Sequence, residues 1–264
     1  MIYKPSQGII SAGGFRNHPR YLGCKAHWLL AEGGGLVAFD ISGNYKNGTL
    51  TSSPTWAAGR FGPAMSFDGV SANVNISDPN ITDDLSAMSV CCWAQSDITV
   101  TTAGRHIVTE HRGGGGDSWA LVLSSSDQIS FTITTSGTVS ALSNVDLPDT
   151  LWHHYVGVYN GANAFLFVDG VKQTSQPAQT GTVLTSTNPV NIGSHSDTNA
   201  WDGLIDEVRI YNRALSAEEV AWLYNDPFAE FRPRRSRVIG QVPAAASPFP
   251  PWPQLPKFMP LLVQ

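Results

Sequence analysis

The chain has 264 residues, 42% of them hydrophobic and 10% aromatic, which suits one large β domain with extra arms or two small domains. Only 14% of the residues are charged and the formal net charge is -5, which argues against a nucleic-acid-binding body. Low charge combined with 25 glycines is typical of many short strands joined by turns.

The first 22 residues predict an irregular N-terminal arm, because Gly13-Gly14 and His18-Pro19 break any regular pattern. The N-terminus has no long apolar run, and no segment is long enough to cross a membrane. We therefore expect neither a cleaved secretion signal nor a membrane partner.

Residues 23–226 alternate between strand-like runs and turn clusters. Asp68-Gly69, Asn160-Gly161 and Asp169-Gly170 are turn pairs typical of tight hairpins. Such a series favours an all-β sandwich or barrel over an α/β fold. The predicted strands are 24–30, 64–67, 74–76, 88–95, 105–110, 119–123, 128–134, 153–159, 164–168, 190–192 and 204–211.

One short helix is predicted to close this region. Ser216 and Glu219 form a capping box, and Asp226-Pro227 ends the helical pattern. The apolar residues at helical spacing are Val220, Leu223 and Tyr224.

Three cysteines, Cys24, Cys91 and Cys92, do not make a disulfide framework, because their number is odd and two are adjacent. Metal-binding C-x-x-C spacing is also absent. Neighbouring strand residues point to opposite faces, so one of Cys91 and Cys92 is expected to face the core as a small hydrophobic residue.

Residues 227–264 differ from the rest and predict an extended C-terminal arm. An arginine cluster opens the arm, and prolines mixed with apolar side chains follow. Such a segment builds no core of its own yet is too apolar to be a solvating tail, and proline-rich chain costs little entropy to order. We expect it to dock on a protein partner through Phe231, Arg232, Arg234, Arg235, Arg237, Trp252 and Phe258, although the arginines also fit a solvated linker.

Six sequence blocks within residues 23–226 carry a resemblance to a known family. They are 27–34, 39–50, 59–69, 89–94, 151–171 and 201–216. The most specific is WDGLIDEVRIYNRALS at 201–216. Together they resemble the laminin-G-like domains of the concanavalin A-like lectin/glucanase superfamily. The resemblance implies an antiparallel jelly-roll sandwich over 23–226, flanked by arms at 1–22 and 227–264. Aromatic residues such as Phe67, Trp93 and Tyr155 would fill its core.

We expect no enzymatic activity. Relatives that hydrolyse β-glucans use paired glutamates a few residues apart on one strand face, and no Glu-x-Asp-x-x-Glu run occurs here. Asp206 and Glu207 are neighbours, so they are expected to point to opposite faces, with Glu207 and Arg209 as a surface pair. A Gly-x-Ser-x-Gly elbow is also absent.

The histidines are interpreted as structural. His153 and His154 are expected in the core or in hydrogen bonds. His106 and His111 are assigned to the surroundings of a mobile loop, because the glycine run 113–116 follows them.

The resemblance also suggests a structural calcium ion near the first and last strands, with Asp206 and Asp40 as its ligands. The alternative for Asp40 is that it caps a turn by bonding its own backbone.

Two functions stay open. The composition of the arms favours a structural or decoration protein of a virus (phage) particle, with the sandwich outward and the arms on capsid or tail subunits or on a second copy of the chain. The alternative is a glycan-binding adhesion or recognition module at a cell surface. In that module Trp56, Trp119 and Trp201, which lie near loops, would stack on sugar rings, although each also fits ordinary packing.

Overall fold

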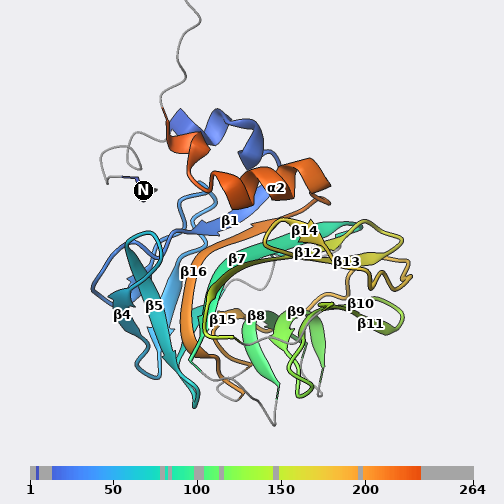
Figure 1. The fold of residues 1–264 in the computed structure, drawn as a ribbon, viewed down its shortest axis with the longest axis horizontal. Helices are drawn as coiled ribbons and strands as arrows, with labels where there is room; N and C mark the ends of the chain where they lie inside the picture. Colours follow the sequence, from blue (N-terminus) through green and yellow to red (C-terminus); the bar gives the residue numbers. More distant parts are fainter. Residues whose placement is uncertain are drawn as a thin grey trace, which may run out of the picture. The chain divides into compact units, whose positions relative to one another are not determined.

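The structure, a computed structural model, describes residues 4–5, 14–77, 81–82, 85–97, 104–112, 116–144, 149–195 and 199–232. Two antiparallel sheets face each other in a sandwich, which confirms the predicted fold class (Figure 1). Short helices lie on the side of one sheet that faces away from the other (Figure 1).

Sheet A contains eight strands, seven of them in the order β14-β13-β12-β7-β16-β5-β4, and β1 pairs with β16 off this path. Its strands are β1 (Cys24–Trp28), β4 (Thr55–Ala58), β5 (Pro63–Asp68), β7 (Met88–Ser96), β12 (Trp152–Tyr159), β13 (Ala164–Val168), β14 (Val171–Lys172) and β16 (Asp202–Tyr211).

Sheet B contains eight strands in the order β11-β10-β9-β8-β15-β6-β3-β2. Its strands are β2 (Val37–Ala38), β3 (Gly48–Thr51), β6 (Asn73–Ile76), β8 (Arg105–His111), β9 (Asp117–Leu123), β10 (Ile129–Thr134), β11 (Thr138–Leu142) and β15 (Val190–Ile192).

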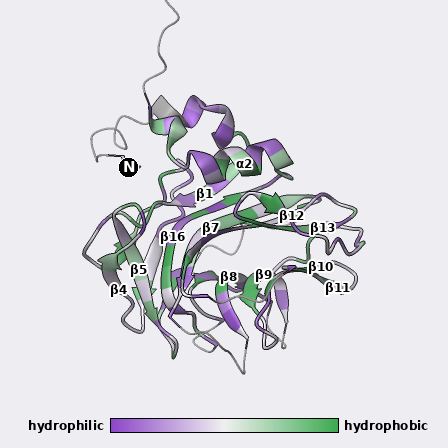
Figure 2. Ribbon diagram, in the orientation of Figure 1, coloured by the Kyte–Doolittle hydropathy of each residue, from purple (hydrophilic) through white to green (hydrophobic). Residues whose placement is uncertain are grey.

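Alternation along the strands builds the core between the sheets. On β10, for example, Ile129, Phe131 and Ile133 belong to the main core cluster, and the hydroxyl residues between them point the other way. The strands of both sheets carry the hydrophobic residues, and the helices are more hydrophilic (Figure 2).

Strand β7 is buried along almost its whole length, because both faces of sheet A are covered. Cys92 faces the core between the sheets, and Cys91 and Trp93 pack under the helices. The expectation that one of the adjacent cysteines faces the core is confirmed, and all three cysteines are free.

The helices and the segments around them, residues 14–22 and 216–232, form what we call the helical layer. Its elements are η1 (Gly14–Asn17), η2 (Pro19–Tyr21), α2 (Ala217–Asn225) and η3 (Ala229–Phe231). The predicted capping box is present: Glu219 N donates to Ser216 Oγ, and Ser216 N donates to the Glu219 carboxylate. In the described part of the chain, no helix combines the length and apolarity that a membrane span needs.

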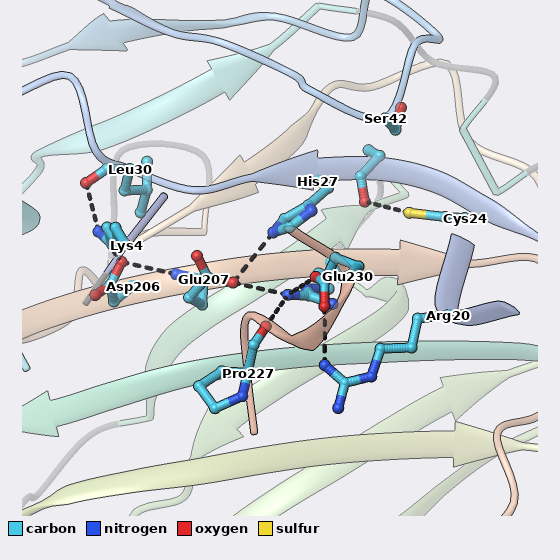
Figure 3. Close-up of polar contacts among 12 residues, drawn as sticks. Lys4, Arg20, Cys24, His27, Leu30, Ser42, Asp206, Glu207, Pro227 and Glu230 are labelled. Atoms are coloured by element: carbon cyan, nitrogen blue, oxygen red, sulfur yellow. Dashed lines mark hydrogen bonds and ion pairs between the residues drawn. The ribbon is translucent and has the colours of Figure 1, made fainter. Parts of the chain in front are cut away.

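A β-bulge interrupts β16. Glu207 has a φ of 53°, and the register between β16 and β7 shifts between Asp206 and Arg209. The extra residue places the side chains of Asp206, Glu207 and Arg209 on the helical-layer side of sheet A (Figure 3). Two expectations are therefore wrong: Asp206 and Glu207 do not point to opposite faces, and Glu207 and Arg209, 3% and 2% exposed, are no surface pair.

Candidate functional site

The face of sheet B that points away from the core, called the outer face of sheet B, carries small polar side chains. Strand pairing places one row of residues side by side across seven strands of the sheet. The row is Thr49, Asn75, Asn191, Thr109, Ala120, Thr132 and Ser140.

Side-chain hydrogen bonds run along this row. Asn75 Nδ2 donates to Asn191 Oδ1 at 3.2 Å, and the Thr132 and Ser140 hydroxyls share a bond of 2.9 Å. The row is exposed at Thr49 and Ser140 and buried in its middle, and no helix among the described elements covers it (Figure 1). The row carries no formal charge, and it presents hydroxyls and an amide to solvent at Thr49, Asn75, Thr132 and Ser140.

Three histidines surround one carboxylate beside the middle of the row. Asp117, at the start of β9, lies 3.4 Å from His106 Nε2, 3.1 Å from His195 Nε2 and 3.6 Å from His111 Nδ1. Thr109 of the row donates its hydroxyl to Asp117 Oδ1 at 3.1 Å. We call His106, His111, Asp117 and His195 the histidine–aspartate cluster.

The cluster favours an ionised carboxylate. Burial opposes ionisation of Asp117, but hydrogen bonds from His106 and His195 outweigh it and hold the pKa of this carboxyl well below its usual range. The hydrogen bond to Asp117 raises the pKa of His195, whereas burial and the neighbouring His195 lower the pKa of His111. The imidazoles thus differ in basicity although they share one partner.

A tight turn between β2 and β3, at the edge of sheet B, displays Tyr45. Asp40 accepts hydrogen bonds from the backbone N–H groups of Ser42 and Lys46, which fixes the turn. Tyr45 has a φ of 59°, rare for a non-glycine residue, and is 86% exposed. Asp40 therefore has the turn-capping role given above as the alternative to calcium binding. The turn holds the aromatic ring of Tyr45 in solvent at the edge of the sheet.

A chain of buried charges joins β16 to the helical layer (Figure 3). Glu207 pairs with His27 at 3.1 Å and with Arg209 at 3.0 Å. Arg209 reaches Glu230 at 2.7 Å, and Glu230 pairs with Arg20 at 2.8 Å. These side chains are almost fully buried and bonded to one another, so the network is a structural joint between sheet and helices.

The two predicted calcium ligands lie in donor-rich surroundings. Asp206 pairs with Lys4 Nζ at 2.5 Å and also accepts from Glu207 N. Both oxygens of Asp40 accept hydrogen bonds from N–H or O–H donors of His27, Ser42 and Lys46. Donors rather than other oxygens surround these carboxylates, which does not fit a calcium ion held by the pair.

Two of the three tryptophans proposed for sugar stacking are core residues. Trp119 and Trp201 are 0% and 1% exposed, and their indole N–H groups donate to Thr82 Oγ1 and Gln95 O. That expectation is wrong for both, because a ring without exposed surface cannot stack on a sugar. Trp56 is half-buried on β4, where its N–H donates to Gly35 O, and its role stays a prediction.

The described part of the C-terminal arm packs on the sandwich of its own chain. Phe231 is buried beside His27 and Phe228, and Arg232 is exposed and pairs with Asp226 at 2.8 Å. The other residues proposed for docking lie outside the described residues, so docking and the virus-particle hypothesis stay predictions. They are Arg234, Arg235, Arg237, Trp252 and Phe258.

A family model matches most of the sandwich, including the 201–216 block. The chain belongs to the concanavalin A-like lectin/glucanase superfamily, whose laminin G model matches residues 68–221. A comparison with curated protein sequences finds no match.

Solved structures share the fold at low sequence identity. Domain 4 of AbnA, an extracellular arabinanase from Geobacillus stearothermophilus solved with arabinotriose, has a TM-score of 0.61 and 19% identity over 76% of this chain and 98% of that domain. The binding domain of Paraclostridial Mosquitocidal Protein 1 has a TM-score of 0.64 and 14% identity over 80% of this chain and 53% of its own.

A Trypanosoma rangeli sialidase solved with sialic acid has a TM-score of 0.60 and 15% identity, and the match covers 79% of this chain and 34% of the sialidase. The chain therefore spans nearly all of the arabinanase domain but much less of the longer structures. These likenesses show the fold: a lectin-like sandwich.

Proposed function

We propose that this chain is a glycan-binding module that recognises neutral oligosaccharides and does not hydrolyse them. The outer face of sheet B carries the proposal. Its row of amides and hydroxyls matches the hydroxyl groups of a sugar, since each partner both donates and accepts hydrogen bonds. The absence of formal charge along the row favours neutral over acidic sugars.

Tyr45 adds an aromatic surface at the edge of the same sheet. The bonded turn holds the ring in solvent in a rare backbone conformation, and such conformations concentrate at functional positions. An aromatic face packs against the apolar C–H face of a sugar ring, so Tyr45 is the stacking residue of the proposal.

The distribution of carboxylates supports binding without hydrolysis. Glycosidases of the two-carboxylate kind place two acids on either side of the scissile bond. On the described strands of the outer face of sheet B, Asp117 is the single carboxylate. Asp206 and Glu207 lie under the helical layer and are engaged by Lys4 and His27.

The domain of AbnA solved with arabinotriose supplies the first probe to try. We expect the full chain to bind neutral oligosaccharides on a glycan array, arabinotriose among the candidates, and to bind sialylated ones more weakly. Calorimetry then measures the affinity of the strongest ligand. Release of reducing sugar by the same protein would contradict the non-enzymatic part of the proposal.

Introducing a charge into the row tests whether the sugar binds there. Thr132→Glu places a carboxylate in the row and is expected to weaken binding at least about tenfold, because the charge must be desolvated against the sugar. Lys172→Glu, on the edge strand of sheet A, is the matched control and should bind as the wild type does. Tyr45→Ala tests stacking separately. Equal affinity of the Thr132 variant and the wild type would rule out this face.

A further inference from the structure

The histidine–aspartate cluster has a geometry that hydrogen bonding alone does not require. Zinc binds nitrogen and oxygen ligands at about 2.0–2.1 Å in a tetrahedron, which sets neighbouring ligand atoms about 3.3 Å apart. The carboxylate oxygens of Asp117 lie 3.4, 3.1 and 3.6 Å from one nitrogen each of His106, His195 and His111. The ligand atoms of His106, Asp117 and His195 all lie within 4.8 Å of one another.

The histidine rings crowd together as ligands of one ion do. The centroids of His111 and His195 are 4.0 Å apart with nearly perpendicular rings, and those of His106 and His195 are 4.7 Å apart. His106 is 8% exposed, and its Nδ1 has no hydrogen-bond partner among the described residues. Asp117 thus gathers one nitrogen of each of three imidazoles around its two oxygens, the arrangement that ligands of a shared ion adopt.

We propose that His106, Asp117 and His195 bind one divalent transition-metal ion of the zinc class, with His111 as the fourth ligand. The donor set decides the class of metal, because imidazole suits zinc, copper or nickel, whereas calcium and magnesium prefer oxygen ligands. The proposal does not depend on glycan binding.

The backbone holds these ligands in place before an ion arrives. Arg112 N donates to Gly116 O at 2.8 Å and closes the hairpin that brings His111 to Asp117. His106 N donates to Asn199 O at 3.0 Å, and Trp201 N donates to Gly193 O at 2.7 Å, which ties the segment of His195 to β8.

Thr109 donates the kind of hydrogen bond that metal-binding side chains usually receive from a neighbouring group, which we call an outer contact. Its hydroxyl donates to Asp117 Oδ1 at 3.1 Å and also reaches Trp119 O, so it fixes the orientation of the carboxylate. Outer contacts of this kind typically change metal affinity by about 10–100-fold when removed.

Calorimetric titration of the chelator-treated full chain with zinc chloride tests the proposal. We expect one ion per chain and a rise in the midpoint of thermal unfolding, with no comparable effect of calcium chloride. Asp117→Asn and His195→Gln should each weaken zinc binding more than about 100-fold, beyond the loss of an outer contact. Circular dichroism confirms that these variants fold.

His153→Gln is the matched control. His153 is also a histidine held by carboxylates, Asp149 and Asp169, but it lies on sheet A away from the cluster. This variant should bind zinc as the wild type does. A wild type that binds no zinc, or cluster variants that bind it unchanged, would overturn the proposal.

Cobalt substitution gives a second readout that needs no variant. Cobalt(II) in a tetrahedral nitrogen and oxygen site gives intense visible bands without the thiolate charge-transfer absorption that Cys24 or Cys91 would add. Zinc should displace it and erase the spectrum. A weak octahedral spectrum or a thiolate band would place the metal elsewhere and contradict the assignment.

Discussion

At the scale of single residues, Arg209 links the sheet to the helical layer. Its guanidinium contacts Glu207 and Glu230 and donates to Pro227 O, all in a buried environment. Burial opposes its charge, but Glu230, Tyr211 and Glu207 together outweigh burial and raise the pKa of Arg209. This role was not predictable, because alternation places Arg209 on the face opposite Val208 and Ile210 but does not show that the helical layer covers that face.

Replacing Arg209 by methionine should destabilise the protein by about 3–5 kcal/mol, because two carboxylates lose a buried partner. Urea denaturation measures the loss. Arg232→Met is the control: its pair with Asp226 is exposed, so the change should stay within about 0.5 kcal/mol. Equal losses for the two variants would show that the buried network adds nothing beyond a surface pair.

The contacts among the histidines of the cluster could not be predicted from the sequence. The strand predicted at 105–110 already contains His106, and β8 extends it to His111, which was expected beside a mobile loop because of the glycines that follow. His195 is distant in sequence, and only the pairing of β15 with β8 brings it near. A single sequence contains no local signal for a contact that the order of strands in a sheet creates.

At the scale of elements, the central strands were predictable and several edge elements were not. β7, β12 and β16 have long apolar or aromatic patterns, whereas β2 and β14 are two residues long and too short for any periodicity. β3 and β11 contain several Thr, Ser or Gly residues and resemble loops in sequence, and β4 is only four residues long. The capping box, a local signal, placed the start of α2 correctly.

The open end of the β12–β13 hairpin, away from its turn, contains a pH-sensitive group of one histidine and two carboxylates. Hydrogen bonds from His153 to Asp169 and Asp149 raise the pKa of this histidine. The bond from His153 lowers the pKa of Asp169, and bonds from Leu151 N and His153 lower the pKa of Asp149. Tyr155 packs beside the ring, and burial keeps the neighbouring His154 neutral, with a pKa of about 3.

A histidine with a raised folded pKa stabilises the protein fully below its unfolded pKa of about 6.5 and loses this contribution as the pH rises through the folded value. The wild type should therefore exceed His153→Gln in stability at pH 5.5, and the difference should shrink at pH 8.5. Urea denaturation at the two pH values measures it. A difference that grows with pH would contradict the assigned ion pair.

At the scale of the whole molecule, the resemblance identified the sandwich, and composition separated the arms from it without showing where the residues next to the sandwich pack. Both described flanks bury side chains on sheet A, as Tyr21 and Phe231 do. Their apolar and charged residues therefore have partners within the chain. Composition shows that a segment needs a partner, but it does not distinguish the chain's own surface from that of another protein.

Truncation separates the two parts of the C-terminal region. A chain ending at Arg232 should keep the thermal midpoint of the full chain within a few degrees. A chain ending at Asp226 should unfold at a clearly lower temperature, because it loses Phe228, Glu230 and Phe231 from the helical layer. Scanning calorimetry on the three lengths decides this, and equal midpoints for 1–226 and 1–232 would contradict it.

The position of the helical layer has a practical consequence for attaching the protein to a sensor surface. Arg232 lies on the helical-layer side of sheet A, and the outer face of sheet B points the opposite way (Figure 1). A sensor surface coupled through this side would leave the amide and hydroxyl row directed into the solution. Immobilisation by a tag after residue 232 is thus the orientation suited to measuring the proposed binding of a soluble sugar or metal ion.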